Sequence, residues 1–189
     1  MNLPNKLTIL RILMIPIFVA VFYITAIPYN YVISAVIFVL AAATDFLDGY
    51  IARKYNLVTN LGKFLDPIAD KVLVSTAFII MLAPLGGTVI LPWYASIVIA
   101  VILGRELIVS GFRIVAASRG VVLAADKTGK IKTFFQDASV AILLVGASVM
   151  PGLYSVVNIV GLVVLAIAGI LTVVSGIEYV VKNIFVLKD

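Results

Sequence analysis

The chain carries the stretch DFLDGYIARKYNLVTNLGKFLDPIAD at residues 45–70, which places four aspartates in an otherwise apolar sequence. Asp45 and Asp48 are three residues apart, and Asp66 and Asp70 are four apart, so each pair shares one face of a helix. The segment between the pairs is long enough to turn the chain and bring the second pair back beside the first. The stretch therefore predicts two neighbouring helices whose acidic faces meet.

The composition indicates that these helices lie in a membrane. Of the 189 residues, 63% are hydrophobic and 12% are charged, and the mean hydropathy is +1.23, outside the range of soluble domains. Six apolar segments approach the roughly 20 residues that cross a bilayer as a helix. They are Leu7–Ile27, Tyr31–Ala52, Phe64–Ala83, Trp93–Ala116, Phe134–Met150 and Ser155–Val181. We expect an all-α integral membrane protein with six transmembrane helices in a single domain, residues 1–189, whose first span is not a removable signal peptide.

The distribution of basic residues predicts the orientation. The connections Ile27–Tyr31, Pro84–Pro92 and Met150–Ser155 contain no charged residue. Basic residues gather near the opposite helix ends, at Lys6, Arg11, Arg53, Lys54, Lys63, Arg119, Lys127, Lys130, Lys132, Lys182 and Lys188. We expect the protein in the plasma membrane. The positive-inside rule then places both of its termini in the cytoplasm. This topology, together with attraction to anionic lipid head groups, explains the net charge of +5. A nucleic-acid partner is not expected.

The acidic pairs are expected near the inner leaflet. Counting from Tyr31 at 1.5 Å per residue, Asp45 lies about 21 Å and Asp48 about 25 Å inward, in a bilayer core about 30 Å thick. The same estimate brings other ionisable residues to this level: Asp66, Asp70, Arg105, Arg113, Lys130 and Lys132. Since ionisable groups inside a membrane usually line a functional cavity, we expect an active site at the cytoplasmic end of the bundle.

Four clustered carboxylates need a counter-charge, because like charges at contact distance resist joint ionisation. One or two divalent cations would supply it, and two is the expected number. Mg²⁺ or Mn²⁺ suits carboxylate oxygens, and Ca²⁺ can compete. The chain has no cysteine and no histidine, so any metal must be held mainly by oxygen. The alternative is simple ion pairing of the aspartates with Arg53, Lys63 and Lys71, which leaves the glycines unexplained.

Small residues continue the first acidic face. Gly49 and Ala52 leave room for a ligand close to the backbone, although small residues also serve helix packing in membranes. Arg53 follows one turn later, and its planar fork suits a phosphate. Together these residues favour a phosphate or nucleotide ligand.

Eight positions in this stretch, which we call the signature, resemble those of the CDP-alcohol phosphotransferases. They are Asp45, Asp48, Gly49, Ala52, Arg53, Gly62, Asp66 and Asp70, in the order D-x₂-D-G-x₂-A-R-x₈-G-x₃-D-x₃-D. Looser similarities point to the bacterial branch that makes phosphatidylglycerol phosphate. They are Pro4-Asn5-x-Leu7-Thr8-x₂-Arg11, Gly104-Arg105-Glu106, Arg113 and Gly129-Lys130-x-Lys132-Thr133-x₂-Gln136.

The resemblance implies transfer of a phosphatidyl group from CDP-diacylglycerol to an alcohol, with release of CMP. It implies that Asp45, Asp48 and Asp66 are metal ligands and that Asp70 completes the site and is the general base. The expected CDP-diacylglycerol-binding residues are Gly49, Ala52, Arg53 and Gly62. A homodimer is also expected.

The looser resemblance in the second half of the chain implies sn-glycerol 3-phosphate as the acceptor, and a phosphorylated alcohol needs cations to bind it. Arg113 and Lys132 are the first candidates for its phosphate, followed by Arg105 and Lys130, with Glu106 orienting Arg105. An inositol-phosphate acceptor, or that of another family member, is the near alternative. A divalent-cation transporter or channel is a distant one, because the acids occupy only the inner end of the bundle. A purely structural membrane protein would leave the aspartate spacing unexplained.

Overall fold

The computed structural model describes residues 2–55, 57, 59–83, 90–121, 123, 127–148 and 151–187. Within these ranges the protein consists of helices and contains no β-strand. The helices are α1 Leu3–Tyr23, α2 Asn30–Lys54, α3 Asn60–Leu82, α4 Ala95–Ser118, α5 Lys127–Ala147, α6 Pro151–Asn183 and the short 3₁₀ helix η1 Ile184–Leu187. The prediction of an all-helical fold is confirmed.

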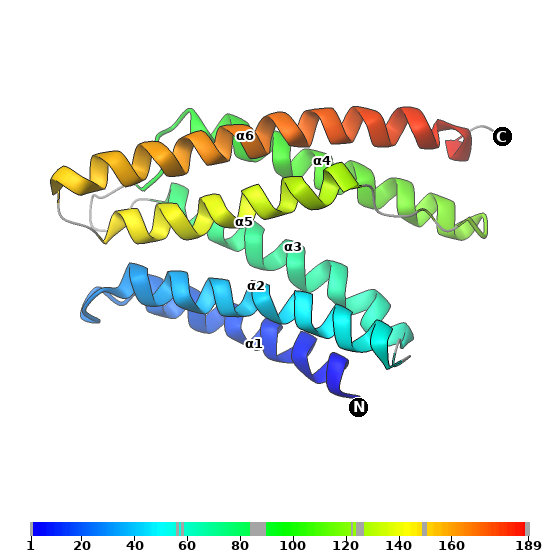
Figure 1. Cartoon of the computed structure of the whole chain (residues 1–189), viewed down its shortest axis with the longest axis horizontal. Helices are drawn as coiled ribbons and strands as arrows, with labels where there is room; N and C mark the ends of the chain where they lie inside the picture. The colour runs from blue at the N-terminus through cyan, green and yellow to red at the C-terminus, as the bar shows by residue number, and fades with distance from the viewer. Residues whose placement is uncertain are drawn as a thin grey trace.

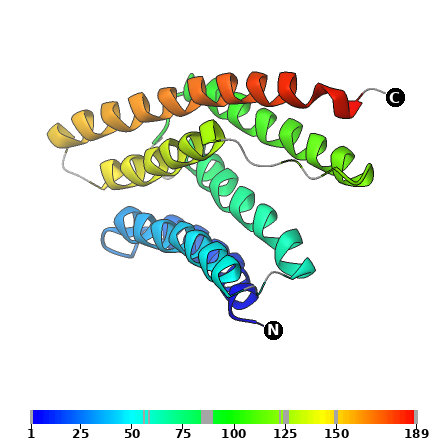
Figure 2. The same ribbon diagram turned by 45° about the vertical axis from the view of Figure 1, so that its right-hand side comes forward.

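Two antiparallel hairpins, α1–α2 and α5–α6, form the two sides of the molecule (Figure 1). Helix α3 starts beside the first hairpin and crosses obliquely toward the second, and α4 packs against α6 (Figure 2). The N- and C-termini lie at the same end of the bundle, at the right in Figure 1. The ends of α2 and α4 and the start of α3 lie toward that end too, and α5 starts nearer the middle (Figure 1).

Local signals explain where two helices begin. The side chain of Asn2 accepts a hydrogen bond from Asn5 N at the start of α1, where Pro4 occupies the first turn. The side chain of Thr59 accepts one from Gly62 N at the start of α3. These caps satisfy backbone donors that have no partner within the helix.

Helix boundaries differ most from expectation where polar residues continue an apolar helix. Helix α5 begins at Lys127 rather than near Phe134, so Lys130 and Lys132 lie inside the helix instead of at a loop edge. Helix α1 begins at Leu3, so Arg11 lies well inside it and not at a helix end. A hydropathy pattern misses the first helical turns of α1 and α5, because it treats their polar residues as the end of a span. Inside the bundle, polar residues can remain helical and face a polar cavity. The connection at residues 84–89 and the expected end of the fifth span at Met150 lie outside the described residues.

Four segments are long and apolar enough to cross a membrane in the part of the chain that the structure describes: Leu3–Tyr23, Asn30–Ala52, Ala95–Ser118 and Val156–Val186. Helices α3 and α5 contain more charged residues, namely Lys63, Asp66, Asp70 and Lys71 in α3 and Lys127, Lys130, Lys132 and Asp137 in α5. The four apolar segments support a membrane protein, and the count of six spans stays a prediction.

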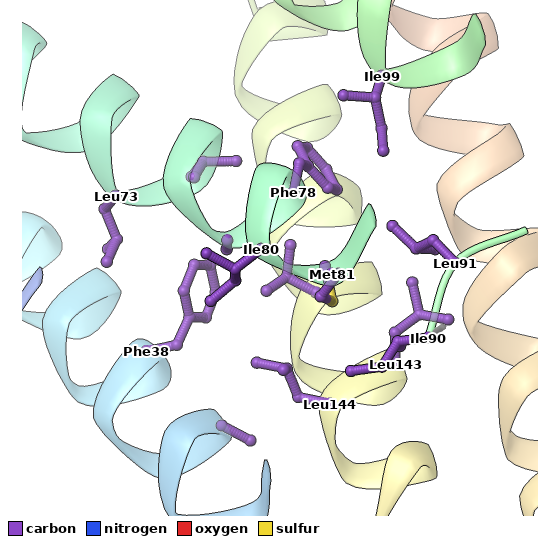
Figure 3. Packing of buried hydrophobic residues seen from close by; sticks show 14 of the residues in the cluster. Phe38, Leu73, Phe78, Ile80, Met81, Ile90, Leu91, Ile99, Leu143 and Leu144 are labelled. Carbon is purple, nitrogen blue, oxygen red and sulfur yellow. The ribbon is translucent and has the colours of Figure 1, made fainter. Parts of the chain in front are cut away.

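The apolar core occupies the half of the bundle away from the basic ends, and Figure 3 shows its packing. Phe78 and Met81 of α3 lie there with Phe38 of α2, Ile99 of α4 and Leu143 of α5. The two halves of helix α3 therefore have different structural roles. Its second half packs the core, and its first half carries Asp66 and Asp70 into the other end of the bundle.

Candidate active site

A cavity of about 640 Å³ lies among α2, α3, α4, α5 and α6 at the basic end of the bundle. It brings together most of the predicted site residues, namely Asp45, Asp48, Gly49, Asp66, Asp70, Arg105, Arg113 and Lys130. The aspartates come from α2 and α3, and the cations come from α4 and α5. One cavity thus has an acidic wall, formed by the aspartates of α2 and α3, and a basic wall, formed by the cations of α4 and α5, although Lys71 of α3 and Glu106 of α4 line it as well.

On the acidic wall, Asp45 and Asp48 share a buried counter-charge from α1. Arg11 is fully buried and donates from Nη1 to Asp45 Oδ1 at 2.8 Å and from Nη2 to Asp48 Oδ2 at 2.6 Å. The side chain of Asp45 is 44% exposed, whereas that of Asp48 is 3% exposed. A carboxylate as enclosed as Asp48 requires such a partner, because an unpaired charge is costly to bury.

The second acidic pair is connected to the first through Thr8. The hydroxyl of Thr8 donates to Asp66 Oδ1 at 2.8 Å and lies 3.4 Å from Asp48 Oδ2. Asp70 lies one turn further along α3, where the nearby charged groups include Asp45 and Glu106. The two acidic faces meet as expected, with α1 packed against both.

The donor set fits a hard divalent cation in chemistry, since four carboxylates line one cavity. Among the residues that the structure describes, no three carboxylates are arranged to hold a metal ion, and two of their oxygens accept hydrogen bonds from Arg11. The metal site therefore stays a prediction. Asp45 and Asp48 pair with Arg11, a cation that the simple ion-pairing alternative does not include. Lys71 instead donates to Ser110 Oγ, and the side chains of Arg53 and Lys63 lie outside the described residues.

The predicted donor-binding residues divide into two groups. Gly49 lines the cavity, whereas Ala52 is not among its described lining residues. Gly62 packs closely against α1, because a Cβ there would lie 3.0 Å from Asn5 Oδ1 and 3.3 Å from Thr59 Oγ1. This glycine allows α1 and α3 to approach at the rim of the acidic wall.

On the basic wall, Arg105 and Arg113 are held by neighbouring polar groups. Arg105 donates from Nη1 to Glu106 Oε1 at 3.1 Å, so the expected orientation of Arg105 by Glu106 is present. It also lies 3.3 Å from Ser175 Oγ. Arg113 Nε donates to the Tyr179 hydroxyl at 3.4 Å. The fixed guanidinium groups present a positive surface to the cavity.

Lys132 lies elsewhere than expected. It is buried, donates from Nζ to Glu106 Oε1 at 2.6 Å and lines a second pocket of about 20 Å³ that also contacts Asp70. Lys132 is therefore connected to the large cavity through its bond to Glu106, which lines both pockets.

The comparison with known families gives a match to the CDP-alcohol phosphatidyltransferase family over residues 1–175. The chain belongs to the CDP-alcohol phosphatidyltransferase family. The resemblance carried by the signature is confirmed.

Three relatives of this phosphatidyltransferase match over nearly its whole length. A protein of Rickettsia bellii (strain RML369-C), named CDP-diacylglycerol--glycerol-3-phosphate 3-phosphatidyltransferase, is 43% identical over 94% of this chain and 93% of its own length. A protein of Bacillus subtilis (strain 168) with the same name is 42% identical over 99% of this chain and 97% of its own. A probable phosphatidylglycerophosphate synthase of Mycobacterium tuberculosis (strain ATCC 25618 / H37Rv) is 40% identical over 96% and 81%.

Some site residues of this phosphatidyltransferase were not expected from sequence. The charge pattern assigns Arg11 to topology, although a charge inside an apolar helix also indicates a site, and Thr8 lies on the same face three residues earlier. Lys71, Ser110 and Tyr179 also line the cavity. Tyr179 carried no signal, because it comes from the apolar last helix, which reaches the site only in the folded bundle.

Proposed function

We propose that this protein transfers the phosphatidyl group of CDP-diacylglycerol to sn-glycerol 3-phosphate, giving phosphatidylglycerol phosphate and CMP. The observation that carries the proposal is that one cavity contains both the acidic wall and the basic wall. The acidic wall suits a metal-bound diphosphate, and the basic wall suits a phosphorylated acceptor. The names of the full-length relatives support this acceptor.

The acidic wall is the proposed metal site. Asp45, Asp48, Asp66 and Asp70 would hold Mg²⁺ or Mn²⁺, and two ions are proposed because four carboxylates gather there. When bound, the ions would neutralise the diphosphate and stabilise the departing CMP. Gly49, Ala52, Arg53 and Gly62 are the proposed donor-binding residues. Gly49 supports this proposal, since it lines the cavity without a side chain between the aspartates and the ligand.

Asp70 is the proposed general base, since it lines both the large cavity and the small pocket behind it. Its carboxylate would accept the acceptor's hydroxyl proton as that oxygen attacks the β-phosphorus and the bond to CMP breaks. Asp70→Asn should lower kcat at least 100-fold, because general-base catalysis contributes roughly 10²–10⁴-fold, while CDP-diacylglycerol still binds. Equilibrium binding of the donor and single-turnover rates separate the two effects. Loss of donor binding would show that Asp70 acts as a ligand instead.

The basic wall is the proposed acceptor site. Arg105, Arg113 and Lys130 form it, Lys71 of α3 lines the same cavity, and charge-assisted hydrogen bonds from such groups suit a phosphate dianion. Lys132 would contribute through its bond to Glu106.

The proposed location is the plasma membrane, with the site and both termini in the cytoplasm, where a water-soluble acceptor is available. The gathering of basic helix ends at one end of the bundle supports this orientation. A homodimer is also proposed. Exposed apolar side chains along the helices leave room for a partner as well as for lipid.

The decisive experiment measures CMP release by detergent-purified protein supplied with CDP-diacylglycerol and Mg²⁺ or Mn²⁺. Parallel reactions contain glycerol 3-phosphate, inositol phosphate, glycerol or serine, and a chelator control tests the metal. Release with glycerol 3-phosphate alone is the expected result. Release with inositol phosphate instead would keep the reaction and overturn the acceptor, and no release with any acceptor would overturn the proposed function.

A further inference from the structure

Four polar residues recur every third position along the first turns of α1: Asn2, at the N-cap, then Asn5, Thr8 and Arg11. Residues at this spacing lie on one face of a helix. The proposed function leaves all four without a direct part in the reaction. Each nevertheless contacts the signature stretch or the loop within it.

Arg11 is bound on every nitrogen. Its Nε donates to Ala41 O and Thr44 Oγ1, both at 3.2 Å, which fixes the guanidinium against α2 independently of the acids. Its two terminal nitrogens then reach one oxygen each of Asp45 and Asp48. The planar fork thereby sets the separation of these carboxylates, which both line the cavity.

Thr8 connects the second acidic pair to the first. Its hydroxyl contacts Asp66 at 2.8 Å and Asp48 at 3.4 Å, so one buried side chain touches a carboxylate from each acidic pair. Since those carboxylates repel each other, they need fixed partners to stay close before any ligand arrives.

Asn2 and Asn5 bind the segment between the two acidic pairs to α1. Asn2 Nδ2 donates to Leu57 O at 2.6 Å. Thr59 Oγ1, which caps α3, donates to Asn5 Oδ1 at 2.9 Å. The start of α3 is thereby aligned with α1, two turns before Asp66.

We propose that Thr8 and Arg11 are positioning residues that arrange Asp45, Asp48 and Asp66 for the divalent cation. This inference rests on the metal site of the proposed function. Partners that orient ligating carboxylates typically contribute 10–100-fold to metal affinity or activity. Removing the Thr8 hydroxyl should therefore weaken metal binding even where the fold is intact.

The test compares Thr8→Val, which keeps the shape and loses the hydroxyl, with Thr8→Ser, which keeps the hydroxyl. Thr172→Val is the matched control, because Thr172 is also buried in a helix and its hydroxyl donates to Ala168 O, four residues earlier. The Thr8 hydroxyl likewise lies 3.2 Å from Pro4 O, but Thr172 contacts no carboxylate among the bonds of the described residues. Mn²⁺ binding to detergent-purified protein without substrate is followed by electron paramagnetic resonance, with thermal unfolding of every variant in parallel.

Thr8→Val should raise the Kd for Mn²⁺ about tenfold, while Thr8→Ser and Thr172→Val stay near the wild-type value. Arg11→Lys, which keeps the charge and loses the fork, should also bind Mn²⁺ more weakly. An unchanged Kd in Thr8→Val, or tighter binding in Arg11→Lys, would overturn the inference and leave the proposed function standing. A wild-type protein that binds no Mn²⁺ but transfers the phosphatidyl group would refute the metal site itself, and the inference with it.

Discussion

At the scale of single residues, Asp45 and Asp48 show how two similar carboxylates can have different roles. Both accept hydrogen bonds from Arg11, yet Asp45 opens to the cavity and Asp48 is enclosed by the protein. Removing one partner of a buried ion pair leaves the other charge uncompensated, which typically costs about 3–5 kcal/mol. Removing an exposed partner lowers the free energy of unfolding much less, because water replaces the lost interaction.

Asp45→Asn and Asp48→Asn should therefore differ in stability while both abolish metal-dependent CMP release. We expect Asp48→Asn to lower the thermal unfolding midpoint in detergent clearly and Asp45→Asn to change it little. Thermal unfolding and CMP release measured on the same preparations check this. Retained turnover in Asp45→Asn would contradict its assignment as a metal ligand, and equal midpoints would contradict the burial argument.

Arg113 belongs to the proposed acceptor site, so its removal should affect the acceptor alone. Arg113→Ala should raise the KM for glycerol 3-phosphate roughly 10–100-fold, as expected for a charge-assisted hydrogen bond of about 1.5–3 kcal/mol, with little change for CDP-diacylglycerol. Arg119→Ala is the matched control, since Arg119 follows α4 and does not line the cavity. A change confined to the donor's KM would place the acceptor elsewhere.

At the scale of helices, α6 is held close to its neighbours by glycines. A Cβ on Gly161 would lie 2.7 Å from Leu143 Cγ on α5, and one on Gly169 would lie 2.7 Å from Val98 Cγ1 on α4. Leu143 is fully buried and has little freedom to move. In lipid, where apolar burial does not drive helices together, such close approach is a main source of packing energy.

Gly161→Ala should consequently lower the thermal unfolding midpoint, by overpacking of about 1–3 kcal/mol. Gly111→Ala in α4 is the matched control, because a Cβ there has no neighbour within 4 Å and alanine is the better helix former. Differential scanning fluorimetry in one detergent compares the two. A midpoint for Gly161→Ala at or above the wild-type value would show that α5 and α6 separate easily.

At the scale of the whole molecule, the arrangement of the bundle places charge and apolar packing at opposite ends. Both termini lie at one end (Figure 1), the cavity lies toward that end, and the aliphatic and aromatic core, whose packing Figure 3 shows, fills the other half. Acyl chains can then remain beside the helices while the head group reaches the cavity from the aqueous side.

The orientation can be tested directly, because the chain has no cysteine. Single substitutions Ala26→Cys, between α1 and α2, and Ser118→Cys, at the end of α4, place thiols at exposed positions of opposite ends. A membrane-impermeant maleimide should label Ala26→Cys in intact cells and Ser118→Cys only after permeabilisation. The reverse pattern would invert the orientation, and equal labelling of both would contradict an embedded bundle.

The sequence by itself determined the helical membrane class, the signature and the family, because these depend on composition and on spacing within one or two helices. Helical periodicity puts Asp45 beside Asp48, and Asp66 beside Asp70, whatever else the chain does. The basic residues of α4 and α5 also indicated the basic wall of the cavity. Hydropathy, however, placed the start of α5 too late and left Lys132 at a loop edge.

Only the tertiary structure decided what the aspartates contact. Arg11 and Thr8 reach them from α1, and Tyr179 reaches Arg113 from α6, across 34 to 66 residues of sequence. These contacts depend on the angle and register at which helices pack, and local periodicity contains no information about either. The physical reason is that a helix fixes which residues share its own face, whereas the neighbouring helices determine what that face meets.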